Sequence, residues 1–86
     1  MKETRILGVY LENRVAEATA VQGILTKYGC SIKTRLGLHE ADADRCSSHG
    51  LILLELAGDA AEWDKLEKDL AACKGVRVGK MSFPAV

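Results

Sequence analysis

The chain has 86 residues, 48% of them hydrophobic, and its 12 basic residues balance 12 acidic ones. This length predicts one domain, spanning residues 1–86, near the lower size limit for folding without disulfides or metals. A balanced charge gives no long-range attraction to nucleic acid or to anionic lipid, so direct nucleic-acid binding is not expected.

Three cysteines, Cys30, Cys46 and Cys73, do not form a disulfide framework, because an odd number cannot pair completely. Free thiols are typical of proteins in a reducing cytosol. The first residues lack the apolar stretch of a signal peptide, and no apolar run reaches the length of a membrane span. The sequence therefore predicts a cytoplasmic protein with no membrane contact.

Two stretches, residues 5–11 and 51–56, are typical of strands that are covered on both faces. Successive strand side chains point to opposite faces, and in both stretches each alternating set is mostly apolar. We expect these strands in the middle of a sheet. The even-numbered set of the second stretch should face the chain's own helices, which leaves Leu51 and Leu53 on the opposite, open face.

Two helices are predicted, over about residues 14–28 and 60–73. Asn13 and Asp59 precede them, and each can accept a hydrogen bond from a first-turn amide as an N-cap. Gly29 is expected to end the first helix with a positive φ. The apolar stripes at 3-4-3 spacing consist of Ala18, Val21, Leu25 and Tyr28 in the first helix and Trp63, Leu66, Leu70 and Cys73 in the second.

Two further strands, residues 30–38 and 76–83, have a more polar pattern and should lie at the sheet edges. In the first of them, alternation places one set on one face, namely Ile32, Thr34, Leu36 and Leu38. The basic residues Lys33 and Arg35 should point the other way, into solvent. Cys30, at the start of this strand, is expected to be packed.

The predicted order is strand, helix, strand, loop, strand, helix, strand. Two such units with right-handed crossovers give an α+β, ferredoxin-like βαββαβ sandwich. Its four-stranded antiparallel sheet carries both helices on one face. The other face keeps an apolar patch of a kind that monomers seldom leave in water. We therefore expect a homo-oligomer, a dimer or a tetramer, formed through the open sheet face or the edge strands.

The turn between the first strand and the first helix is the candidate small-molecule site. Amides at a helix N-terminus can hold a carboxylate or a phosphate, and Arg14 could assist beside Glu12 and Asn13. In an oligomer, Gly29, Cys30 and Ser31 of a neighbouring subunit could close this site. The alternative is a plain capped helix start.

Residues 39–49 form a polar loop that contains imidazole and thiol groups. His39, Cys46 and His49 could bind a metal or respond to redox conditions. Their spacing matches no standard metal site, so a solvated loop is the competing interpretation. Cys46 with His49 also lacks the third group that would make a catalytic set. We predict no enzymatic activity and no cofactor.

Several short segments resemble a known family. These segments are Arg5-Ile-Leu-Gly-Val-Tyr-Leu-Glu-Asn-Arg, Gln22-Gly-Ile-Leu-Thr-Lys-Tyr-Gly, Arg35-Leu-Gly-Leu and Lys74-Gly-Val-Arg-Val-Gly-Lys-Met. Together they resemble the small stand-alone ACT-like proteins described as iron-only hydrogenase system regulators. The resemblance covers about residues 5–83 and implies an ACT-like fold with oligomers built through sheets.

ACT domains more widely bind amino acids at subunit interfaces, and their Asp-x-Pro-Gly turn is replaced here by Glu12-Asn13-Arg14-Val15. The resemblance therefore implies a regulatory module without fixing its ligand. Our prediction is an oligomeric, non-enzymatic, regulatory or small-ligand-binding module. The alternatives are a metal- or redox-responsive protein that uses the 39–49 loop, and a structural subunit.

Overall fold

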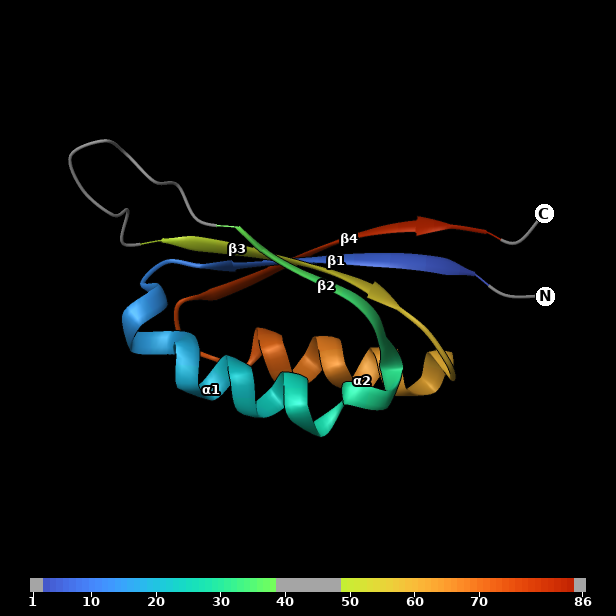
Figure 1. The fold of residues 1–86 in the computed structure, drawn as a ribbon, viewed down its shortest axis with the longest axis horizontal. Helices are drawn as coiled ribbons and strands as arrows, with labels where there is room; N and C mark the ends of the chain where they lie inside the picture. Colours follow the sequence, from blue (N-terminus) through green and yellow to red (C-terminus); the bar gives the residue numbers. More distant parts are fainter. Residues whose placement is uncertain (1–2, 39–48, 85–86) are drawn as a thin grey trace.

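The computed structural model describes residues 3–38 and 49–84. The elements in chain order are β1 (Thr4–Leu11), α1 (Arg14–Lys27), a 3-10 turn (Gly29–Ser31), β2 (Ile32–Leu38), β3 (Gly50–Leu56), α2 (Ala60–Ala71) and β4 (Val76–Phe83). Both helices lie side by side on one face of the sheet (Figure 1). Neither helix in this part of the chain is long and apolar enough to cross a bilayer.

The four strands pair in the order β2-β3-β1-β4, and every neighbouring pair is antiparallel. The predicted ferredoxin-like fold class is thereby confirmed, with the two strands that are apolar on both faces in the middle. Buried apolar side chains from the sheet and both helices form one core. The core residues are Leu7, Val9, Leu11, Val21, Leu25, Tyr28, Leu54, Leu56, Trp63, Leu66, Leu70 and Val76.

Both predicted N-caps are confirmed. The Asn13 side chain accepts a hydrogen bond from the Ala16 amide at 3.2 Å, and Asp59 accepts one from the Ala61 amide at 3.0 Å. The expected positive φ at Gly29 is wrong. The helix is followed directly by the 3-10 turn, in which the Ser31 amide donates to the Tyr28 carbonyl, so no left-handed cap residue is needed.

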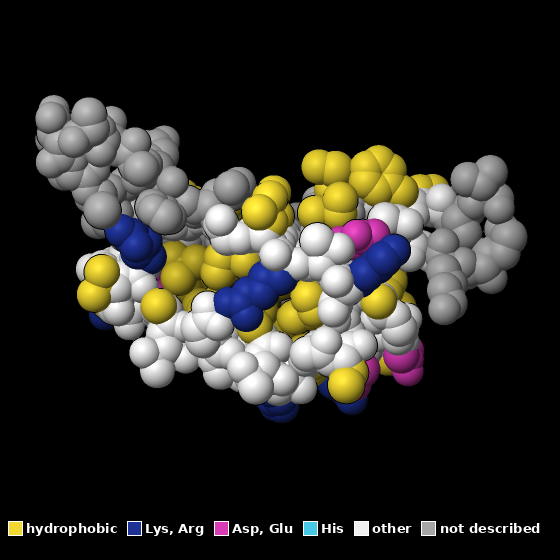
Figure 2. All heavy atoms as spheres, viewed as in Figure 1, with side chains coloured by type: hydrophobic (Ala, Val, Ile, Leu, Met, Phe, Trp, Pro, Cys, Tyr) yellow, Lys and Arg dark blue, Asp and Glu magenta, His cyan; other side chains and the backbone are white. Residues whose placement is uncertain are grey.

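The helix-free face of the sheet is apolar, as predicted for Leu51 and Leu53. Leu51 lies opposite Tyr10, and Leu53 lies opposite Gly8. Met81 on β4 belongs to the same face and is 56% exposed. Hydrophobic side chains stand on the side of the sheet away from the helices in Figure 2. This face is referred to below as the open face.

The predicted alternation along β2 holds from Thr34 onward and is wrong for Ile32, because the strand contains a β-bulge between Ile32 and Thr34. Ile32 pairs with Leu56, but Thr34 pairs with Glu55, so one residue is extra between them. An extra residue reverses which face the following side chains point to. Ile32 therefore packs against the core. Leu36 lies opposite Leu53 on the open face, and Arg35 falls opposite Leu54, on the helix side of the sheet.

Candidate functional site

A hollow of about 270 Å³ lies where the first half of α1 passes over the ends of β2 and β3. Its apolar lining includes Leu11, Val21 and Ile52. Its polar side chains are Arg14, Gln22 and Arg35. Near the centre of the face shown in Figure 2, basic side chains lie over hydrophobic surface. This hollow is called the arginine hollow below.

Local structure brings the two arginines of the hollow together from distant parts of the sequence. Arg14 is the first residue of α1, and the Asn13 cap fixes where that helix starts. Arg35 reaches the helix side of the sheet because of the bulge in β2. The sequence singles out Arg14 but not Arg35, because plain alternation from Ile32 places Arg35 on the face opposite to Ile32. The only sequence signal for this shift is the apolar side chain of Ile32, which fits a position facing the core better than one facing away from it.

Glu12 lies beside the hollow, in the turn after β1, and it already has partners in the second half of the chain. Its Oε1 accepts a hydrogen bond from the Arg77 guanidinium at 2.7 Å. Its backbone amide donates to the Gly75 carbonyl at 2.9 Å. The Arg77 and Glu12 side chains are both exposed. Glu12 therefore connects the turn to β4, and its carboxylate is neutralised within the chain.

The N-terminus of α1 is capped by the chain's own side chains. The Asn13 amide donates to Glu17 Oε1 at 3.0 Å, and the Glu17 amide donates to the Asn13 carbonyl at 3.0 Å. The Glu17 carboxylate lies against the Cα of Gly75. It thus occupies the position next to the helix amides where an external anion would be attracted. A ligand anion would have to displace Glu17, or bind farther out at Arg14.

Gly29, Cys30 and Ser31 lie at the other end of α1. A helix of 14 residues separates them from Glu12 and Asn13 by about 20 Å. One chain does not bring the two groups together, so closure of the site by a neighbouring subunit stays a prediction. Ser31 is buried, and its carbonyl accepts from the Ala57 amide at 2.8 Å.

The expectation that Cys30 is packed is wrong. It is exposed, because the chain makes a 3-10 turn at this point and β2 begins only at Ile32. Ser31 takes the inward position instead. Cys73 is partly buried against the core, as its place in the helical stripe predicted.

The alternative metal site falls mostly outside the described residues. His39 and Cys46 are not among them. The His49 ring, directly before the start of β3, lies 5.6 Å from the Tyr10 ring, centroid to centroid. Within residues 3–38 and 49–84, no group of three or more His, Cys, Asp or Glu side chains is arranged to hold a metal. The role of His39, Cys46 and His49 stays a prediction.

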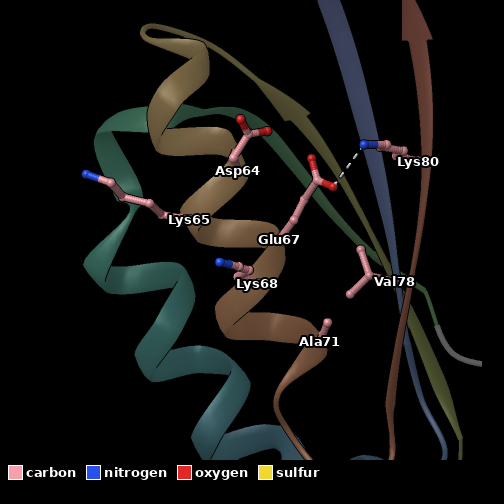
Figure 3. A pocket seen from close by; sticks show the side chains of 7 residues that line it. All are labelled: Asp64, Lys65, Glu67, Lys68, Ala71, Val78 and Lys80. Carbon is pink, nitrogen blue, oxygen red and sulfur yellow. Dashed lines mark ion pairs between the residues drawn. The ribbon is translucent and has the colours of Figure 1, made fainter.

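A second, wider groove of about 510 Å³ runs between α2 and β4. Figure 3 shows Glu67 extending from α2 toward Lys80 on β4, with Ala71 and Val78 farther along the groove toward the C-terminal end of α2. The Glu67–Lys80 ion pair measures 3.4 Å. Glu67 also accepts from the Arg5 guanidinium at 2.6 Å.

Arg5 binds the Glu67 carboxylate of this groove and thereby ties it to β1. It also pairs with Glu3 at 2.9 Å, and its guanidinium lies 5.2 Å from the Trp63 ring centroid. The hydrogen bond to Glu3, together with those to the other carboxylates, raises the pKa of Arg5 above its ordinary value. Its side chain is 12% exposed, so this permanent cation is stabilised by neighbouring carboxylates within the chain. The arginine hollow is therefore the better ligand-site candidate.

Comparison with known proteins supports the fold. No protein-family model and no curated protein matches the chain. An uncharacterized protein from Thermotoga maritima has a similar structure, with a TM-score of 0.79 and 23% identity, covering 96% of this chain and 100% of that one.

A nitrogen regulatory PII-like protein from Thiomonas intermedia, bound to ADP, AMP and bicarbonate, has a TM-score of 0.57 and 15% identity. The match covers 99% of this chain and 97% of that one. A formyltetrahydrofolate deformylase from Pseudomonas putida matches with a TM-score of 0.55 and 16% identity, over 91% of this chain but only 28% of the enzyme. At these identities the likeness shows a shared fold, one that occurs both alone and as part of a larger enzyme.

Proposed function

We propose that this protein is a homo-oligomeric, non-enzymatic regulatory module of ACT-like type that binds a small ligand beside the β1–α1 turn. The observation that carries the proposal is the arginine hollow next to that turn. It combines an apolar lining with a few polar side chains, which is the usual composition of a small-molecule site.

The chemistry of the hollow favours binding over catalysis. Its polar side chains are two arginines and a glutamine. A guanidinium stays protonated at any physiological pH and a carboxamide does not titrate, so neither can act as a general acid or base. Both can bind and orient a ligand. The structural likeness to a nitrogen regulatory PII-like protein bound to ADP, AMP and bicarbonate supports such a role.

The open face supports the oligomeric part of the proposal. Ile6, Leu36 and Leu53 lie on it with no covering helix. Both sheet edges instead carry basic residues, such as Lys33 on β2 and Lys80 on β4. Lysine side chains on an edge strand discourage its pairing with another copy. Stacking through the open face is therefore favoured over edge-to-edge extension.

The resemblance to the iron-only hydrogenase system regulators belongs to this proposal as its finer form. In that form the module would be a cytoplasmic regulator that transmits ligand occupancy to a partner protein. The similar Thermotoga maritima protein is itself uncharacterized, so it adds the fold and no activity.

Native mass spectrometry tests the proposal, using gently purified protein and the variant Leu53→Asp. We expect an oligomer for the natural sequence, carrying extra small-molecule mass. Leu53→Asp should shift it to monomer, because a carboxylate in the centre of a stacked face would lose its hydration. As a control, Lys33→Asp at the edge should leave the oligomer intact. A natural-sequence monomer, or an unaltered oligomer in Leu53→Asp, would refute the open-face interface.

A further inference from the structure

We propose that the arginine hollow binds a compact organic oxyanion, meaning a carboxylate or phosphate carried on a small apolar body, with Arg35 as the main anion contact. This rests on the proposed function in that it takes the hollow to be the ligand site. It adds the chemical class of ligand and a specificity residue from β2.

The first argument is the charge of the lining. Arg14 and Arg35 converge on the hollow from α1 and β2, and no acidic side chain lines it among the described residues. A planar guanidinium presents paired N–H donors that match the two oxygens of a carboxylate or phosphate. The wider groove along α2 differs in this respect, because Asp64 and Glu67 belong to its lining.

The second argument is the β-bulge, which separates the side chains of two basic residues of the same strand. Lys33 Nζ lies 3.7 Å from Glu55 Oε2, a carboxylate on the neighbouring strand. Arg35 follows the bulge and is directed to the helix side, opposite Leu54. Bulges recur next to binding sites because they redirect a side chain. Here the redirection brings a second cation to the hollow that contains Arg14.

The third argument is shape. The floor of the hollow is aliphatic, and Gly37 contributes no side chain to it. A Cβ added at Gly37 would meet no atom of the described residues within 4 Å, so among them this part of the hollow is unfilled. A volume of about 270 Å³ is at the small end of ligand pockets. It suits one ring or a short branched chain next to the anionic group, and is too small for a dinucleotide.

The test is a two-dimensional NMR titration of the full chain with three probes that share one ring: phenylacetate, phenyl phosphate and the neutral phenylacetamide. We expect one or both anions to shift the backbone amide signals of Val21, Gly37 and Ile52, with little effect from phenylacetamide. A response to phenylacetate alone identifies a carboxylate site, and a response to phenyl phosphate alone identifies a phosphate site.

Two variants test the residues. Arg35→Gln should weaken anion binding about tenfold or more, since a hydrogen-bonded charge is lost. The matched control Lys33→Gln, on the same strand but outside the hollow, should bind within about twofold of the natural protein. Gly37→Val should block the hollow while leaving both arginines in place. All three positions lie on the exposed edge strand β2, so the substitutions should leave the fold intact. A spectrum of each variant without probe that matches that of the natural protein will show this.

The inference is overturned if neither anion shifts the lining amides, if phenylacetamide binds as well as phenylacetate, or if Arg35→Gln binds like Lys33→Gln. These outcomes leave the proposed function standing where native mass spectrometry still finds an oligomer carrying a neutral ligand. An empty oligomer together with anion binding at the hollow would instead support this inference while removing the evidence for a resident ligand.

Discussion

The two halves of the chain repeat a strand–helix–strand unit, yet their helices and strands pack differently. In the second half, α2 is strongly amphipathic and buries Trp63, Leu66 and Leu70 along one stripe. Its strand β4 pairs with β1 in unbroken register. In the first half, α1 is weakly amphipathic and buries only Val21 and Leu25 along its length. Its strand β2 contains the bulge, and the arginine hollow opens beside it.

The groove and the hollow also differ in the charges that line them. The groove along α2 in the second half is the larger of the two, but its Glu67 carboxylate pairs with Arg5 and Lys80. The smaller hollow beside α1 has cationic side chains over an apolar floor, and no acidic side chain among the described residues lines it. Burial of apolar side chains is the main favourable contribution to folding, and both halves supply it. The difference in charge is what makes the arginine hollow in the first half the candidate binding site.

The largest expected effect comes from truncating a buried side chain of the second half. Leu66→Ala should lower the free energy of unfolding by about 2–5 kcal/mol, because Leu66 is fully buried and its loss leaves a cavity. Val15→Ala on α1 is the matched control. Val15 is 81% exposed, so the free energy of unfolding should change by less than about 0.5 kcal/mol. Urea unfolding measures both variants, and equal effects would contradict the place of Leu66 in the core.

The next effect concerns Gly75, which precedes β4 and lies against Glu17 in the first turn of α1. Its φ is +79°, and a Cβ there would collide with the Glu17 carboxylate. Gly75→Ala should cost at least about 1–2 kcal/mol from the backbone conformation alone. It should also displace Glu17 from the Asn13 amide. Adding Glu17→Ala should remove the steric part and leave the conformational part. An unchanged urea midpoint in Gly75→Ala would exclude this contact.

A smaller effect of opposite sign is expected at Gly23, in the exposed part of α1. A Cβ at this position would meet nothing within 4 Å. Gly23→Ala should therefore raise the free energy of unfolding by about 0.5–1 kcal/mol, since alanine loses less backbone freedom on forming a helix. Thermal unfolding measures this change. A lowered midpoint would show that the surface of α1 is covered, for example by another subunit.

The smallest effect is the pH response of the link between the two helices. The Tyr28 hydroxyl donates to Asp69 Oδ2 at 2.8 Å, and this hydrogen bond lowers the pKa of Asp69 in the folded state. A lowered folded-state pKa gives stability that is present above the unfolded pKa and lost as the pH falls through the folded one. Tyr28→Phe should flatten this loss below about pH 4. Acid titration of the unfolding midpoint compares the two proteins, and parallel curves would mean that the bond contributes nothing.

Much of the fold could be predicted from the sequence because it depends on local patterns. Asn13 and Asp59 cap the two helices through bonds to amides two or three residues away. The parity of Leu51 and Leu53 placed them on the open face, since strand side chains alternate regardless of what lies around them. Local hydrogen bonding and alternation are encoded within a few residues, and such signals can be read without knowing the partners.

The candidate site could be predicted only in part, because its geometry depends on contacts between distant segments. The bulge that turns Arg35 toward α1 arises where Ile32 packs into the core against Leu56 while Thr34 pairs with Glu55. The exposure of Cys30 follows from the same packing, since it is Ser31 that the chain turns inward. Alternation determined which residues could share a face. Only tertiary packing decided where the alternation was interrupted. An extra residue in a strand is stable only if the side chains that it redirects are better buried in the core.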